Sequence, residues 1–183
     1  MIETNSILVA MKRSKWERDI LRYGSEEYVR RLYRLQNVSC DKIISSHDRQ
    51  HLAFDKIKSK LPQAVFAFRE ELHHIDFSRI HAMFILGGDN HFVYVSHYAT
   101  SQPVLGLNSD PHTSSGALLS FSAEKFADAL PESVHGFSFE TEDWVRIDCN
   151  IYYPDGRQTE TGPGTSEISI RNSFADMMSR YFV

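Results

Sequence analysis

Two segments of the chain combine residue types that can do chemistry, and each follows an apolar run. One is Gly87–His91, with the sequence GGDNH, and the other is Asn108–Asp110, with the sequence NSD. Glycines lack a Cβ atom, so a ligand can approach the backbone and its N–H groups can bind phosphate oxygens. Asp89, next to these glycines, can accept a proton from a hydroxyl group or hold a magnesium ion. In the alternative interpretation, the segment is a plain strand-to-helix turn with Asp89 as a helix cap.

Histidines provide two further candidates. His47 and His51 stand at positions i and i+4, which is the spacing of zinc-binding pairs on a helix. The metalloprotease version of this pair needs a glutamate next to the first histidine, but Asp48 is shorter, and the sequence shows no third ligand. We therefore interpret the pair as part of a solvated helix face. His91 directly follows the glycine turn and can contact a phosphate there, although a position at the start of a helix is its commoner role.

The elements that must position these residues alternate between strands and helices up to about residue 133. Continuous apolar runs predict strands that are covered on both faces, and apolar residues at helical spacing predict helices. This order predicts a parallel sheet with helices on both faces, where ligands bind beyond the carboxyl ends of the strands. The predicted strands are 6–11, 41–44, 80–86 and 103–108, and the predicted helices are two within 14–37 and one each within 45–61, 92–100 and 122–130.

The pattern changes near residue 140. Residues 144–160 alternate between apolar and polar side chains and contain Pro-Asp-Gly, which is typical of a turn between antiparallel strands. Two more strands are predicted at 166–172 and 178–183. We therefore predict an α/β nucleotide-binding domain at 1–138 and the beginning of a β-rich substrate-binding domain at 139–183. Because the chain stops in apparent mid-strand, we expect a partner chain or a longer protein to complete this sheet.

Composition narrows the classes of protein that the chain can belong to. The 183 residues include 42% hydrophobic residues and carry a net charge of -4, which argues against a broad basic face for nucleic acid. No apolar run is long enough to span a membrane, and the N-terminus is unlike a signal peptide. The two cysteines, Cys40 and Cys149, exclude a disulfide scaffold and fit a reducing compartment. We expect a cytoplasmic protein that binds neither nucleic acid nor membrane.

Several segments, taken in order, resemble NAD kinases of the bacterial and mitochondrial-type branch. MFILGGD, followed by a predicted helix and PVLGLNSDPHTSSGALLSF, is similar to the family's Gly-Gly-Asp-Gly-Thr strand end and to its Val-Asn-Thr-Asp-Pro-like segment. ILVAMKRSKWERDILRYG is similar to the branch's opening strand and helix, with a lysine and then glutamate-arginine. TSEISIRNSFADMMSRYFV resembles the family's Asn-Glu strand. The likeness covers nearly all of the chain apart from about 124–142.

The resemblance implies a function, a set of cofactors and a set of site residues. NAD kinases use ATP and a divalent metal such as Mg²⁺ to phosphorylate the 2'-hydroxyl of the adenosine ribose of NAD, and they work as homo-oligomers. Asp89 would deprotonate the attacking hydroxyl, and no residue is assigned as a direct metal ligand. The phosphates or the nucleotide would contact Gly87, Gly88, Asn90 and His91; NAD would contact Asn108, Ser109, Asp110, Ser166 and Glu167.

Three departures from the family pattern keep a second interpretation open. Asn90-His91 replaces Gly-Thr, Ser166 replaces the asparagine of Asn-Glu, and the family's later Gly-Ser-Thr-Ala-Tyr-like segment does not occur in this sequence. Asparagine tolerates the left-handed backbone of glycine, but the threonine hydroxyl is lost. The chain is therefore either a NAD kinase or a degenerate relative that binds NAD or another adenine nucleotide without phosphoryl transfer. A kinase of the same superfamily acting on a lipid hydroxyl is a more distant alternative.

Overall fold

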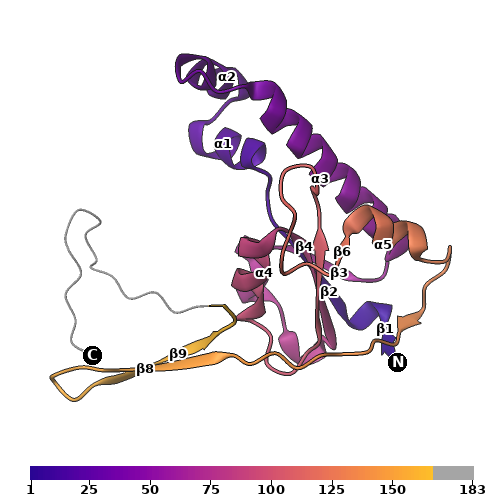
Figure 1. Ribbon diagram of the computed structural model, residues 1–183, viewed down its shortest axis with the longest axis vertical. Coiled ribbons are helices and arrows are strands. Elements are labelled where there is room, and N and C mark those ends of the chain that lie inside the picture. Colours follow the sequence, from indigo (N-terminus) through magenta and orange to yellow (C-terminus); the bar gives the residue numbers. More distant parts are fainter. Residues whose placement is uncertain (167–183) are drawn as a thin grey trace. The chain divides into compact units, whose positions relative to one another are not determined.

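The computed structural model describes residues 1–166, which divide into one compact unit, Met1–Thr141, and a second that begins at Glu142. The first unit is an α/β structure around a five-stranded parallel sheet (Figure 1). The prediction of a parallel sheet with helices on both faces is confirmed. In sheet order, the strands are β3 (Val65–Phe68), β2 (Ile7–Met11), β4 (Ala82–Gly87), β5 (Val104–Asn108) and β6 (Phe121–Ser122).

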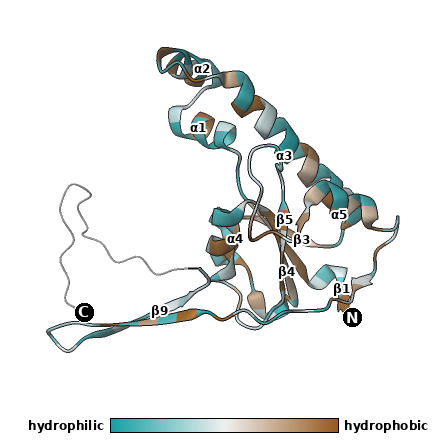
Figure 2. Ribbon diagram, in the orientation of Figure 1, coloured by the Kyte–Doolittle hydropathy of each residue, from teal (hydrophilic) through white to brown (hydrophobic). Residues whose placement is uncertain are grey.

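Successive residues of each central strand point to opposite faces of the sheet, and helices cover both faces. Ile7 and Val9 pack in the cluster formed with α3 (Cys40–Lys60) and α5 (Ala123–Ala129). Leu8 packs in the cluster on the other face, which includes residues of α4 (Asp89–Ser96). Because β2 and β4 are buried along their whole length, their sequences are continuous apolar runs, visible as hydrophobic strands in Figure 2.

Two short helices precede the long helix α3 and pack against its first turns. In α1 (Lys15–Tyr23), Ser14 and Glu17 form a reciprocal capping box, and the helix ends at Gly24 in the left-handed conformation, with φ 88°. In the following α2 (Glu26–Leu35), Ser25 is the N-cap, because its side chain accepts a hydrogen bond from the Tyr28 N–H. A separate apolar cluster, with Trp16, Val29 and Tyr33 at its centre, joins the three helices.

The sequence-based prediction of the first unit contains one wrong strand and lacks another. The strand predicted at 41–44 was wrong, because α3 begins at Cys40 and runs without a break to Lys60. Ile43 and Ile44 pack against the cluster around Trp16, so tertiary contacts hold this apolar pair in a helix. Strand β3 was missed. The remaining elements are short: β1 (Ile2–Glu3) pairs with β7 (Gly136–Phe137), and the 3₁₀ helices are η1 (Thr4–Ser6), η2 (Arg69–His74) and η3 (Phe77–Arg79).

The described part of the second unit is a β-hairpin. Strands β8 (Ile147–Tyr152) and β9 (Gln158–Gly164) pair antiparallel, as their alternating pattern predicted. The turn between them contains Gly156 with φ 84°, a conformation that glycine adopts readily. The strands predicted at 166–172 and 178–183 lie outside the described residues, apart from Ser166.

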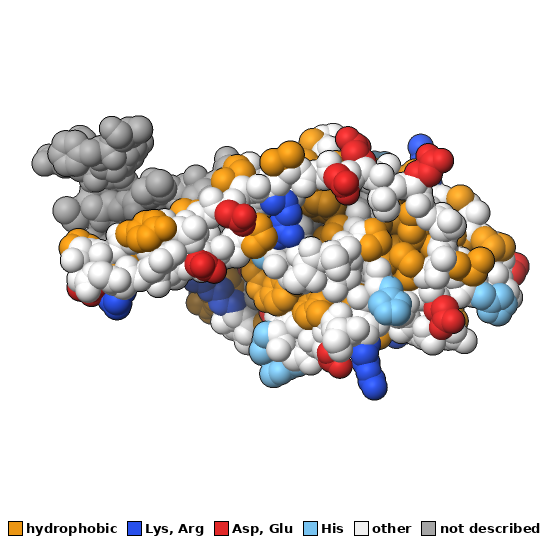
Figure 3. Space-filling view, turned by 90° about the horizontal axis from the view of Figure 1, so that it is seen from below, with side chains coloured by type: hydrophobic (Ala, Val, Ile, Leu, Met, Phe, Trp, Pro, Cys, Tyr) orange, Lys and Arg blue, Asp and Glu red, His pale blue; other side chains and the backbone are white. Residues whose placement is uncertain are grey.

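One face of the molecule and the described helices bear on the predicted absence of a basic surface and of a membrane span. On the face seen in Figure 3, acidic and basic side chains are interspersed with hydrophobic ones. Among residues 1–166, no helix combines the length and the apolar character needed to cross a bilayer.

Candidate functional site

The two segments that carry the candidate residues lie side by side at the carboxyl edge of the sheet. Strands β4 and β5 are parallel neighbours, and Gly87 is in register with Asn108. The Ser109 N–H donates a hydrogen bond to the Gly87 carbonyl oxygen over 3.1 Å. In sheets of this kind, ligands bind beyond this edge. The glycine turn and Ser109 are therefore direct neighbours at this edge.

Asp89 is the first residue of α4, and its carboxylate holds the loop that follows β5. Its two oxygens accept hydrogen bonds from the backbone N–H groups of Ala117, over 3.1 Å, and Leu118, over 2.9 Å. A carboxylate has about four lone-pair positions, so each oxygen can still accept a further proton donor such as a substrate hydroxyl. Asp89 is partly exposed, and it therefore combines a structural contact with access to a ligand.

His91 lies beneath the glycine turn and faces away from the surface. Only 2% of it is exposed, and its Nε2 is 3.2 Å from the Ala10 carbonyl oxygen, to which it donates in the Nε2–H tautomer. Burial lowers the pKa of His91 to about 4, so the ring is neutral at pH 7. A buried neutral ring does not reach a phosphate outside the turn, so the structure places His91 differently from the expected phosphate contact. Asn90, in contrast, is exposed.

Lys12 is a cationic side chain that sequence reasoning did not include in the site. It directly follows β2, and its Nζ lies 3.7 Å from the point where a Cβ at Gly88 would be. Burial lowers the pKa of Lys12, and the nearby positive charges of Arg18 and Arg69 lower it further. The available signal was the lysine within ILVAMKRSKWERDILRYG, the segment that resembles the opening strand and helix of the family. The sequence does not show that this lysine lies next to Gly88.

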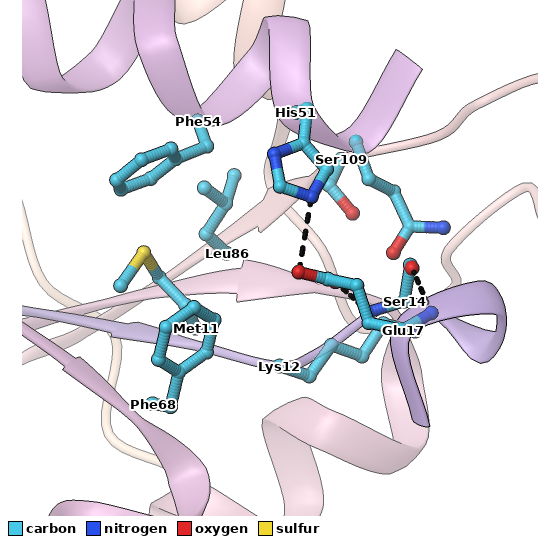
Figure 4. A pocket seen from close by; sticks show the side chains of 10 residues that line it. Met11, Lys12, Ser14, Glu17, His51, Phe54, Phe68, Leu86 and Ser109 are labelled. Atoms are coloured by element: carbon cyan, nitrogen blue, oxygen red, sulfur yellow. Dashed lines mark hydrogen bonds and ion pairs between the residues drawn. The ribbon is translucent and has the colours of Figure 1, made fainter. Parts of the chain in front are cut away.

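A small pocket adjoins this lysine beyond the carboxyl ends of the strands (Figure 4). Its volume is about 50 Å³, whereas pockets that enclose whole ligands measure roughly 300–1,000 Å³. The pocket therefore has room for a small anionic group or a hydrated ion, and the rest of a nucleotide would extend outside it. It is lined by Met11, Lys12, Ser14, Glu17, Gln50, His51, Phe54, Phe68, Leu86 and Ser109.

The loop after β5 is held in place by the buried side chains of Asn108 and Asp110. Asn108 accepts a hydrogen bond from the Asp110 N–H and donates one to the Ser114 carbonyl oxygen. The Asp110 carboxylate accepts hydrogen bonds from Arg49, at 2.7 Å and 3.1 Å, and from the hydroxyls of Ser46 and Thr113. Both residues lie near the site as expected, but their polar atoms stabilise the wall of the pocket.

We expect Asp110→Asn to lower the free energy of unfolding by about 2 kcal/mol at pH 7. Burial by itself would raise the pKa of Asp110, but hydrogen bonds from Arg49, Ser46 and Thr113 lower it to about 2. Since the unfolded-state pKa is about 3.9, the stabilisation is complete above that value and is lost as the pH falls from about 4 to 2. Urea unfolding at pH 7 and pH 3 measures this difference.

The exposed residue Asp48 provides the matched control for this prediction, because Asp48→Asn removes a carboxylate from α3, the helix that carries Arg49 and Ser46, without removing a buried contact. We expect this control to unfold like the wild type at both pH values. An Asp110→Asn variant whose loss of stability is the same at pH 3 as at pH 7 would contradict the ion pair as the cause.

The remaining NAD-contact residues of the sequence prediction belong to the second unit. Ser166 is exposed, and Glu167 lies outside the described residues. Within the first unit, the structure thus brings together Gly87, Gly88, Asp89, Ser109 and Lys12 at one edge of the sheet. A comparison with protein-family models gave no match to this chain, and a search of curated proteins gave none either.

Proposed function

We propose that the chain is a NAD kinase-like protein, which uses ATP with Mg²⁺ to phosphorylate the 2'-hydroxyl of the adenosine ribose of NAD. One observation carries this proposal: Lys12 lies beside the same glycine turn that presents the Asp89 carboxylate, at the carboxyl edge of a parallel sheet. A cation beside the turn and a proton acceptor on it suit phosphoryl transfer to a hydroxyl. By resemblance to the family, we also propose a cytoplasmic homo-oligomer.

Each residue of the turn has a separate task in this proposal. The Lys12 ammonium group neutralises phosphate charge, and the absence of a side chain at Gly88 lets the phosphate approach it. Asp89 accepts the proton of the 2'-hydroxyl while the ribose oxygen forms its bond to the γ-phosphorus of ATP. The bond between that phosphorus and the bridging oxygen breaks, and ADP leaves. Binding and orientation supply most of the rate.

Magnesium fits this site as a companion of the triphosphate. The Asp110 carboxylate is occupied by Arg49, Ser46 and Thr113, and both Asp89 oxygens already accept N–H groups. Mg²⁺ prefers oxygen ligands and keeps several waters, often binding through one or two carboxylates and the substrate phosphates. When bound, it would neutralise the developing charge between the phosphates. Because Asp89 is the base in this proposal, the ion would be held by the phosphates and its own waters, without a direct bond to Asp89.

One observation favours the alternative of a module that binds NAD or an adenine nucleotide without transferring phosphate. Both oxygens of Asp89 hold the backbone of the loop after β5, which is a structural task. In addition, the buried His91 occupies the position where the family has a threonine hydroxyl. If the carboxylate serves only the loop, the turn retains its cation and its glycines but has no base.

The test measures NADP formation from NAD, ATP and MgCl₂ by mass spectrometry, and the melting temperature with NAD alone. We expect NADP from the wild type and an at least tenfold lower kcat/KM for ATP in Lys12→Met, because the phosphate loses its cation. Lys42→Met, an exposed lysine on α3, serves as the control and should behave like the wild type. Stabilisation by NAD without NADP formation would favour the binding module. If NAD is neither converted to NADP nor raises the melting temperature, the family assignment is overturned.

A further inference from the structure

Three potential metal ligands converge at the contact between helices α1 and α3. Glu17 comes from α1, and His47 and His51 come from successive turns of α3. His51 Nε2 is 3.2 Å from Glu17 Oε1, and His47 Nδ1 is 4.0 Å from Glu17 Oε2. One ligand atom from each residue lies within 4.8 Å of the other two. We propose that these residues form a binding site for a divalent transition-metal ion, with Zn²⁺ as the preferred ion.

The donor set matches the chemistry of zinc. Two imidazole nitrogens and one carboxylate oxygen are the protein ligands of open, three-ligand zinc sites, whereas Mg²⁺ and Ca²⁺ prefer oxygen alone. Zinc–nitrogen and zinc–oxygen bonds of roughly 2.0–2.2 Å place neighbouring ligand atoms slightly more than 3 Å apart in a tetrahedron. The pair His51–Glu17 already has this separation, at 3.2 Å. His47 Nδ1 is 4.0 Å from Glu17 Oε2, so His47 must move toward the carboxylate when the ion binds.

The capping box of α1 orients the carboxylate for this role. Glu17 Oε2 accepts a hydrogen bond from the Ser14 N–H over 2.8 Å, which leaves Oε1 directed at His51 (Figure 4). Ser14 Oγ accepts the Glu17 N–H and lies 2.9 Å from His47 Nδ1. The hydrogen bond from the Ser14 N–H fixes the orientation of the Glu17 carboxylate, as outer hydrogen bonds do for metal ligands. The Ser14–His47 contact uses the imidazole nitrogen that faces Glu17, so binding of a metal to that nitrogen replaces this contact. The same backbone contacts that begin the helix therefore hold the Glu17 carboxylate within 3.2 Å of His51 Nε2 and 4.0 Å of His47 Nδ1.

The ligands are accessible, and the site has an open side. The side chains of Glu17 and His47 are 23% and 22% exposed, and that of His51 is 44% exposed, so an ion can enter from solvent. Glu17 and His51 also line the pocket that contains Lys12 and Ser109. The remaining coordination position of the metal therefore borders this pocket, where a water or an oxygen of a bound anion can occupy it. This inference stands independently of the proposed kinase activity.

The experiment measures zinc binding to untagged protein by competition with a chromophoric chelator, with total metal determined by elemental analysis. We expect one Zn²⁺ per chain and an at least tenfold loss of affinity in each of Glu17→Gln, His47→Ala and His51→Ala. Cobalt(II) titration adds a spectroscopic readout, because a four-coordinate nitrogen and oxygen site gives visible absorption bands that disappear in the variants. A purely structural role of these residues would not produce the bands.

Two features of the chain keep this test sharp. Glutamine at position 17 retains the capping box, so Glu17→Gln removes the ligand charge without unfolding α1. The exposed pair His73 and His74, with ring centroids 3.8 Å apart, provides the matched control His73→Ala/His74→Ala, which should keep full zinc binding. A wild type without stoichiometric zinc, or ligand variants that melt normally and bind zinc like the wild type, would overturn the proposal.

Discussion

Replacing Asp89 with asparagine should reduce the rate of NADP formation by about 10²–10⁴-fold, because the hydroxyl loses its proton acceptor. Asparagine is nearly isosteric with aspartate, and its amide oxygen can still accept one of the N–H groups of Ala117 and Leu118 that Asp89 now holds. The loop after β5 therefore keeps part of its anchor. We expect kcat to fall much more than the affinity for NAD or ATP, since the lost interaction belongs to the chemical step.

Measuring the melting temperature of the same variant separates the two tasks of Asp89. A residue that only holds the loop would lower stability and nucleotide binding together when it is changed to asparagine or alanine. A catalytic base instead lowers kcat in Asp89→Asn while NAD still raises the melting temperature as in the wild type. Asp128→Asn, an exposed aspartate on α5, is the control for loss of a carboxylate. An Asp89→Asn variant with more than half of the wild-type kcat would refute the base assignment.

Alanine at each of the two neighbouring glycines should have opposite consequences. Gly87→Ala should lower the free energy of unfolding by about 1–3 kcal/mol, as overpacking does. A Cβ at this position would lie 2.7 Å from Cδ2 of the buried His91 ring, closer than such atoms approach. The ring cannot move aside easily, because it is enclosed next to Ala10. The glycine at 87 is therefore needed for packing inside the protein.

Gly88→Ala should leave the stability within about 1 kcal/mol of the wild type but weaken phosphate binding. The backbone at Gly88, with φ -127° and ψ 179°, suits alanine, which restricts the unfolded chain and stabilises by about 0.4–1 kcal/mol. Alanine is a poorer N-cap than glycine for α4, and this loss offsets the gain in stability. The new methyl group would stand 3.7 Å from Lys12 Nζ, in the space where a phosphate oxygen would lie. Thermal unfolding and ATP titration of the two variants measure the contrast.

A double-mutant cycle with His91 provides the control for the first half of this contrast. If Gly87→Ala acts through the imidazole, its effect in a His91→Ala background should be smaller by about 0.5–3 kcal/mol, because the clash is gone. Additive effects of the two substitutions would show that the ring is not the cause. Equal destabilisation by Gly87→Ala and Gly88→Ala would contradict the assignment of packing to one glycine and ligand access to the other.

The class of the fold and most of the element types could be inferred from the sequence, because each depends on local pattern. Strands buried on both faces, such as β2 and β4, are continuous apolar runs, and the caps at Ser25 and Ser122 are single residues before amphipathic segments. Once the sheet is parallel, the carboxyl ends of its strands lie at one edge. The approach of the glycine turn to the segment after β5 followed from this rule.

Contacts between elements depend on sheet order and helix packing, and local patterns contain neither. Ile43 and Ile44 suit a strand by composition, yet the cluster around Trp16 holds them in α3. His91 follows the turn in sequence, but its side chain is buried beneath it, and the cation beside Gly88 is Lys12, which follows the neighbouring strand β2. Similarly, the sequence shows no third ligand for the pair His47 and His51. The packing of α1 on α3 places Glu17 within 3.2 Å of His51. The candidate residues at this edge of the protein therefore include residues far apart in the sequence, which only the packed fold brings together.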